Sequence, residues 1–274
     1  MLRSVEDLEG YAIAASDGVI GHVEDLYFDD EAWAVRYFVV NAGSWLSNRK
    51  VLISPFAVGK PSASERVLPV SLTREKVKNS PDIDTDKPVS RQHEIDYLSY
   101  YGYPLYWGGA GFWGAGVYPG AMLSAWGYGA TPGSTTDPTN KGPAETQPEP
   151  HADSHLRSCR TVRDYHLHAS DGDIGHVEDM LVDDETWAIR YLVVNTSNWW
   201  LGHKVLIAPQ WIDSVRWPDA KVSVDLTRQA VKDSPPYMHT APLDRQQETG
   251  LYEHYDRPSY WAADLKRDTE ISRV

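Results

Sequence analysis

The chain contains one sequence pattern twice, and this duplication constrains the fold more than any other feature. The segment DGVIGHVED at residues 17–25 returns as DGDIGHVED at residues 171–179. The same separation of 154 positions relates Trp33 to Trp187, so no net gap accumulates between the copies. Because roughly four positions in ten are identical over the repeated region, the sequence predicts two copies of one fold instead of one large domain.

The duplication divides the 274 residues into four predicted segments. Each copy spans roughly 90 to 100 residues, which is long enough to bury a core without a metal or a disulfide. The segment between the copies is rich in Gly, Ala and aromatic residues and then in Pro, Thr and Glu, so we expect a disordered linker. The predicted boundaries are 1–107 for the first repeat with a helical appendage, 108–160 for the linker, 161–263 for the second repeat with its appendage, and 264–274 for a charged tail.

Short runs of β-branched and aromatic residues between Gly, Asp and Pro predict a mainly β fold, as a small barrel or sandwich, in each copy. The expected strands of the first copy are residues 20–28, 33–41 and 51–54, and the second copy repeats them. The first strand does not alternate cleanly, so we expect a β-bulge near Gly21, near Glu24-Asp25, or at both places. The second strand is apolar on both faces, which predicts that it is covered on both sides.

Each copy is predicted to end in two helices. Thr73 and Thr227 are plausible N-caps of a first helix of one or two turns. Ser90 and Asp244 are plausible N-caps of a second helix, which should end before the next proline.

Composition excludes several classes of protein. The formal net charge of −13 argues against broad binding of nucleic acid or of anionic lipid surfaces. The single cysteine, Cys159, has no partner for an intrachain disulfide, which fits a reducing compartment. The sequence shows neither a signal peptide nor 18 uninterrupted apolar residues, so we expect a cytoplasmic protein without a transmembrane segment.

A family resemblance rests on three motifs. They are the repeated Asp-Gly-x-Ile-Gly-x-Val-x-Asp pattern, the run WAVRYFVV at residues 33–40, and KVLISP at residues 50–55. Together they resemble the PRC-barrel domain, which is shared by the photosynthetic reaction centre H subunit and a bacterial ribosome maturation factor. The resemblance covers both copies. It implies tandem small, strongly bent β-barrels that dock other macromolecules and are not catalytic.

The segment after the first predicted barrel looks similar to the C-terminal part of the H subunit. The residues that carry this likeness are 77–81, Arg91, Glu94, 100–102 and Tyr106. The membrane helix of the H subunit and the additional N-terminal barrel of the ribosome factor have no counterpart in the sequence. The resemblance to the remaining stand-alone PRC-barrel proteins implies protein interaction.

The sharpest chemical pattern is a histidine followed by two carboxylates in each copy. A divalent metal is one interpretation, because His nitrogen and carboxylate oxygen are suitable ligands once a second region contributes. The alternative, which we favour, is a set of solvated polar positions on a bent strand, with Asp capping a bulge. The candidate metal ligands are His22, Glu24, Asp25, His176, Glu178 and Asp179.

The H-subunit likeness also implies carboxylates near a proton entry path. Glu24, Asp25, Asp29, Asp30 and Glu31 would form such an acidic rim. A charged turn is the simpler interpretation.

Other recurring residues have structural or interface interpretations. Arg36 and its counterpart Arg190 are expected to pair with a carboxylate of the acidic turn. Trp45, Trp199 and Trp200 lie in a loop between strands, where aromatic side chains suit either a protein interface or the covering of an open barrel end.

The sequence thus predicts a non-enzymatic protein-interaction (adaptor) protein without a cofactor, with a protein partner and no nucleic acid. We expect the two repeats to pack as a pseudo-twofold pair, with separate beads on a string as the alternative. Two other functions stay open: an H-subunit-like accessory of an electron-transfer membrane complex that influences proton transfer, and a metal-binding protein.

Overall fold

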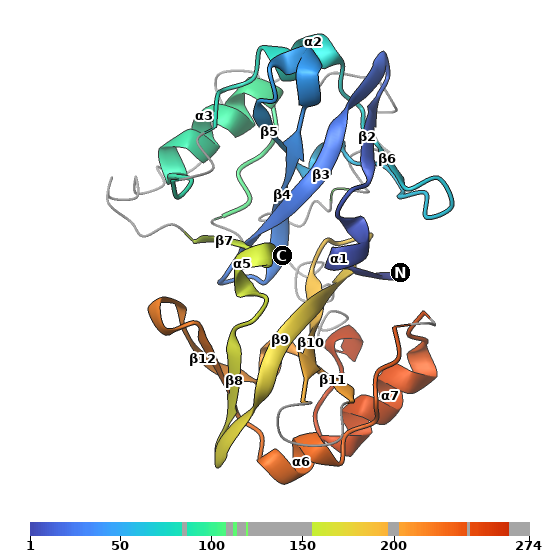
Figure 1. The fold of residues 1–274 in the computed structure, drawn as a ribbon, viewed down its shortest axis with the longest axis vertical. Coiled ribbons are helices and arrows are strands. Elements are labelled where there is room, and N and C mark those ends of the chain that lie inside the picture. The colour runs from blue at the N-terminus through green and yellow to red at the C-terminus, as the bar shows by residue number, and fades with distance from the viewer. Residues whose placement is uncertain are drawn as a thin grey trace, which may run out of the picture. The chain divides into compact units, whose positions relative to one another are not determined.

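The computed structural model is mainly β, which confirms the fold class predicted from the sequence. Its strands form two separate sheets, and its helices are short (Figure 1). Most of the predicted linker and all of the predicted tail lie outside the residues that the structure describes. The described residues are 1–83, 87–107, 112–113, 119, 155–196, 203–239 and 242–262.

The chain divides into two compact units. Unit 1 comprises Met1–Glu9, Asp25–Val35 and Arg157–Val274, and unit 2 comprises Gly10–Glu24 and Arg36–Leu156. Two segments of the first repeat therefore belong to the unit that holds the second repeat. The domain boundaries drawn from the sequence stay a prediction.

Five strands of the first repeat, in the order β5-β4-β3-β2-β6, form a six-stranded sheet together with β7 (Leu156–Ser158), which pairs with β3. Its neighbouring strands are antiparallel where β2 meets β3 and parallel where β2 meets β6. All three strands predicted for this repeat are present, with ends shifted by one or two residues. The bounds are β2 (Ala12–Ala15), β3 (Gly18–Asp29), β4 (Ala34–Asn41), β5 (Lys50–Ile53) and β6 (Val67–Pro69).

Six strands of the second repeat, in the order β11-β10-β9-β8-β13-β12, form a seven-stranded sheet together with β1 (Leu2–Ser4), which pairs with β9. The strands β12 and β13 form a hairpin around the turn Trp217–Asp219. The bounds are β8 (His166–Ala169), β9 (Gly172–Asp183), β10 (Ile189–Asn195), β11 (Lys204–Ile207), β12 (Ile212–Arg216) and β13 (Lys221–Val224).

The helices after each sheet begin at the predicted caps. The side chains of Thr73, Ser90, Thr227 and Asp244 each accept a hydrogen bond from the backbone N–H of the third residue that follows. These helices are α2 (Arg74–Lys78), α3 (Arg91–Tyr101), α6 (Arg228–Lys232) and α7 (Arg245–His254).

The irregular pattern of the long strands arises from β-bulges. In β9 the pairing with β8 skips Ile174, and the pairing with β10 skips Glu178. In β3 the pairing with β2 skips Ile20. The bulges expected near the glycine and near the Glu-Asp pair are therefore both present in the second repeat, and the first of them is present in the first repeat.

The second predicted strand of each repeat, β4 or β10, is covered on both faces, as predicted. Every residue from Ala34 to Val40 in β4 is buried, and so is every residue from Ile189 to Val194 in β10. Alternate residues of a strand point to opposite faces, so continuous burial requires packing on both sides.

Ordered structure begins within the segment predicted as linker. Besides β7, the helix α5 (Cys159–Val162) lies there, and it corresponds to α1 (Val5–Leu8) of the first repeat. The triplet Leu-Arg-Ser precedes both helices. Cys159 thus occupies the position of Val5, and both side chains are fully buried. A three-residue strand has too few positions for alternation to show, so the apolar pattern did not identify this segment.

The glycine after the first bulge is required by a close approach of two backbones. A Cβ atom placed on Gly175 would overlap the carbonyl oxygen of Asn195, and the same holds for Gly21 and Asn41. In contrast, a Cβ atom on Gly250 of α7 would meet no atom within 4 Å.

We predict that Gly175→Ala lowers the free energy of unfolding by about 2 kcal/mol or more, because the strand end at Asn195 must move. The matched control Gly250→Ala should leave it unchanged or raise it by up to about 1 kcal/mol, because alanine favours a helix. Urea unfolding of both variants measures this. Equal stabilities of the two variants would contradict the close approach.

Candidate interaction site

The first strand of each repeat pairs with the long strand of the other repeat. The strand β1 runs antiparallel to β9, with Leu2 opposite Asp183 and Ser4 opposite Leu181. In the equivalent contact, β7 pairs with β3. The segments Met1–Glu9 and Arg157–Arg163, here called the exchanged segments, both belong to unit 1.

A buried aspartate holds each exchanged segment at the start of its helix. The Ser4 hydroxyl donates to Asp179 Oδ2 at 2.5 Å, and the Glu6 N–H donates to Oδ1 at 3.1 Å. The Ser4 oxygen also accepts a hydrogen bond from the Asp7 N–H at 3.0 Å, so it caps α1 while it binds the carboxylate.

The second exchanged segment repeats this arrangement. The Ser158 hydroxyl donates to Asp25 Oδ2 at 2.5 Å, and the Arg160 N–H donates to Oδ1 at 3.1 Å. Burial raises the pKa of both Asp25 and Asp179, and the hydrogen bonds from serine and backbone act in the opposite direction. Each carboxylate therefore depends on the donors of the segment that it holds.

Ion pairs flank the two capped helices. Arg3 Nε donates to Asp184 Oδ2 at 2.7 Å, and the equivalent Arg157 Nε donates to Asp30 Oδ2 at 2.7 Å. The acidic turn of the first repeat, which the sequence suggested as part of a proton-relay rim, thus pairs with an arginine of an exchanged segment, and so does the equivalent turn of the second repeat.

A further backbone contact joins the turns before β4 and β10. The Val35 N–H donates to the Trp187 carbonyl at 2.8 Å, and the Ile189 N–H donates to the Trp33 carbonyl at 2.7 Å. Between them Ala34 and Ala188, which are equivalent residues of the two repeats, form an antiparallel bridge.

The structure does not bring the three candidate metal ligands of either repeat together. In the first repeat His22 is exposed, Glu24 forms an ion pair with Lys50 at 2.7 Å, and Asp25 is buried at the exchanged segment. A bulge lies between Val177 and Asp179, so neighbouring carboxylates reach different partners.

The second repeat has the same division of roles. Glu178 binds Lys204 and accepts a hydrogen bond from the Asn195 amide at 2.9 Å, whereas Asp179 binds Ser4, the N-cap of α1. His176 lies on β9 opposite His166. Among the described residues, no group of three or more His, Cys, Asp and Glu side chains is placed to hold a metal ion.

A second buried carboxylate, missed by the sequence analysis as a site, attaches the C-terminal helix to the sheet of each repeat. Glu248 of α7 accepts a hydrogen bond from Tyr191 at 2.9 Å and forms an ion pair with Arg245 at 3.1 Å. Arg245 also donates to the Tyr260 hydroxyl at 3.2 Å. Only 3% of Glu248 is exposed. Burial raises the pKa of Tyr191, so its hydroxyl stays a donor.

The equivalent carboxylate of unit 2 is Glu94. It accepts hydrogen bonds from Tyr106, from Tyr37 at 3.4 Å and from Arg91 at 3.1 Å. The signal in the sequence was the identical spacing of Tyr, Arg-x-x-Glu and Tyr in both copies.

Both recurring arginines are buried and lie over aromatic rings. Arg190 pairs with Asp183 at 3.4 Å, which confirms the pairing with the acidic turn, and its guanidinium lies 4.1 Å from the Tyr260 ring centre. Arg36 lies over the rings of Tyr106 and Trp113 at 4.0 and 4.6 Å. The buried Trp113 comes from the segment predicted as linker.

Of the three tryptophans predicted to interact, Trp45 is described and Trp199 and Trp200 lie outside the described residues. The Trp45 indole donates to the Ile20 carbonyl at 2.5 Å, and the Arg74 guanidinium lies 4.3 Å from its ring centre. The half-buried Trp45 therefore covers the end of β3.

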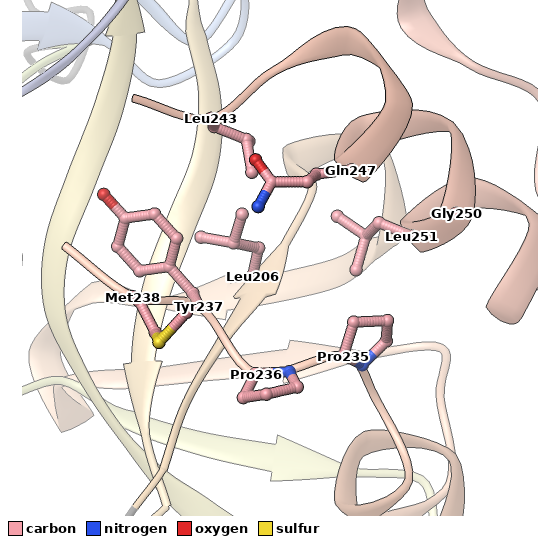
Figure 2. Close-up of a pocket in the computed structure, with 9 residues that line it drawn as sticks. All are labelled: Leu206, Pro235, Pro236, Tyr237, Met238, Leu243, Gln247, Gly250 and Leu251. Atoms are coloured by element: carbon pink, nitrogen blue, oxygen red, sulfur yellow. The ribbon is translucent and has the colours of Figure 1, made fainter. Parts of the chain in front are cut away.

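A cavity lies between β11 and α7 in unit 1 (Figure 2). Its volume is about 200 Å³, and no carboxylate, imidazole or thiol lines it. Gln247 supplies a polar side chain, and the lining is otherwise largely apolar, including Leu206, Pro235, Pro236, Met238 and Leu251. Tyr237 also lines the cavity, and its phenol is the one ionisable side chain among these lining residues.

Comparison with known families gives one assignment. Residues 2–73 match the PRC-barrel domain. The matched PRC-barrel region starts at β1 and ends at the N-cap of α2, so it includes the exchanged segment Met1–Glu9. No curated protein matches the chain. In the part of the chain that the structure describes, every helix is too short or too polar to cross a bilayer.

We predict a pH-dependent difference in the free energy of unfolding between the wild-type chain and the variant Asp25→Asn/Asp179→Asn. As the pH falls from 7 toward 4, the wild type should gain stability relative to the variant. Burial raises the pKa of both carboxyls in the folded protein. At pH values between the ordinary pKa and the raised pKa, folding is therefore accompanied by proton uptake. Asparagine keeps an oxygen for the backbone donors and does not titrate. Urea unfolding at several pH values checks this, and we expect the difference in the free energy of unfolding to change steadily in favour of the wild type as the pH falls. A constant difference would contradict the raised pKa.

We predict that Tyr191→Phe lowers the free energy of unfolding by about 1.5 to 3 kcal/mol, because the buried Glu248 carboxylate loses a donor. Tyr37→Phe should cost less, because its hydroxyl lies 3.4 Å from Glu94 instead of 2.9 Å. Urea unfolding of the two variants tests the order, and the reverse order would show that these distances do not set the energies.

Proposed function

We propose that the chain is a non-enzymatic protein-interaction (adaptor) protein whose two PRC-barrel-like repeats pair with each other through the exchanged segments. The observation that carries the proposal is that Asp179 binds the N-terminus of α1 and, reciprocally, Asp25 binds the N-terminus of α5. The match of residues 2–73 to the PRC-barrel domain supports an interaction role.

The contacts support pairing because each occurs twice with equivalent residues. The Ser4–Asp179 bond corresponds to the Ser158–Asp25 bond, and the Arg3–Asp184 pair corresponds to the Arg157–Asp30 pair. An interface in which residue i binds j and j binds i is isologous, as in twofold dimers. A duplicated chain reproduces such an interface within one molecule.

A non-enzymatic role is supported by the use that the fold makes of its buried acidic groups. Asp25 and Asp179 hold the exchanged segments, and Glu94 and Glu248 hold the C-terminal helices. Burial raises the pKa of the Cys159 thiol, which keeps it protonated and unreactive.

We place the protein in the cytoplasm, with protein partners and without nucleic acid. Its only cysteine is unpaired, and its net charge of −13 repels phosphates. The H-subunit-like role and the metal-binding role stay predictions.

We predict that the two halves stay associated after cleavage of the full chain at a protease site inserted between residues 120 and 150. Size-exclusion chromatography with light scattering should give one particle with the mass of the whole chain. Asp25→Ala with Asp179→Ala should weaken this association at least about tenfold, because the buried serine and backbone donors lose their acceptor. Separation of the wild-type halves at micromolar concentration would refute the pairing.

The adaptor role is tested by affinity capture from native lysate with covalent cross-linking. The expected result is a defined protein that the purified chain then binds directly at a stoichiometric ratio. Turnover of a small molecule by the purified chain, with no direct protein binding, would overturn the role.

A further inference from the structure

The two exchanged helices meet at an ion pair between equivalent positions. Glu9 and Arg163 are separated by 154 residues, so they occupy the same place in the two repeats. Their side chains form an ion pair, and Arg160 approaches the other oxygen of Glu9 at 3.3 Å. The Glu9 and Arg163 side chains are each 19% exposed, so water only partly screens their charges.

Contact between equivalent residues has a consequence for specificity. On the axis of an isologous interface, each residue faces its own equivalent. If two first repeats paired in this way, Glu9 would face Glu9. If two second repeats paired, Arg163 would face Arg163, with Arg160 beside it. Opposite charges meet only when a first repeat pairs with a second repeat.

The other reciprocal contacts do not distinguish these pairings. The bonds from Ser4 to Asp179 and from Ser158 to Asp25 use the same residue types on both sides. The same is true of the flanking pairs of arginine with aspartate. Among these reciprocal contacts, the charges at Glu9 and its two arginines therefore distinguish like from unlike repeats.

We propose that the charges of Glu9, Arg160 and Arg163 favour the pairing of a first repeat with a second repeat over the pairing of two like repeats. This inference rests on the proposed pairing of the repeats. The occupant of this surface is the second repeat of the chain itself. Like charges placed opposite each other across an interface suppress wrong partners, whereas complementary charges set the register.

The test uses the full chain with the cleavable site between residues 120 and 150, cleaved after folding. Three variants are compared with the wild type: Glu9→Arg, the double change Arg160→Glu/Arg163→Glu, and the combination of all three changes. The dissociation constant of the halves is measured by fluorescence anisotropy on dilution, with one half labelled. Glu65→Arg is the control, because it makes the same change of charge at an exposed turn.

Each one-sided reversal should weaken the association at least about tenfold, and the combined swap should return it to within about threefold of the wild type. Glu65→Arg should stay within about twofold of the wild type. If the wild-type halves associate and Glu9→Arg associates equally well, the charge selection is wrong and the pairing stands. If the combined swap is as weak as the single reversals, the charge selection is also wrong. If the wild-type halves separate, the pairing itself is wrong.

Discussion

The structure of unit 1 depends on two buried carboxylates, Asp25 and Asp179. Burial of a charge is costly unless hydrogen bonds replace water, and here the donors come from a serine hydroxyl and a helix N-terminus of the other repeat. The bulge at Glu178 lets the neighbouring acid face Lys204 while Asp179 faces inward. The β-bulge, the cap of the helix and the attachment of the exchanged segment therefore depend on one another.

The buried glutamates act within a repeat, not between repeats. Glu94 and its donors all belong to unit 2, and Glu248 and its donors all come from the second repeat. Each C-terminal helix is thus held by a strand of its own repeat, whereas each N-terminal segment is held by the other repeat. This difference explains why the matched PRC-barrel region of residues 2–73 contributes to both units.

Features that depend on neighbouring residues were predictable from the sequence. The caps at Thr73 and Ser90, the bulge at Ile20 and the double-sided burial of β4 follow from residue type and local pattern. The exchange of β1 and β7 was not predictable, because a three-residue strand has no periodicity and its partner lies far away in the chain. The role of Asp25 was not predictable for the same reason, because its hydrogen-bond partners lie far away in the chain. Its sequence neighbours suggested a metal-ligand set instead.

Whether a position is identical in the two repeats or differs between them depends on its role in the structure. Positions set by geometry or burial are identical, such as Gly21 with Gly175 and Asp25 with Asp179. A homodimer has one sequence on both sides, so a position that meets its own equivalent cannot carry opposite charges. Duplication within one chain removes that restriction. The ion pair of Glu9 with Arg163 is a contact of this kind, and it is available only because the two sides of the interface are encoded separately.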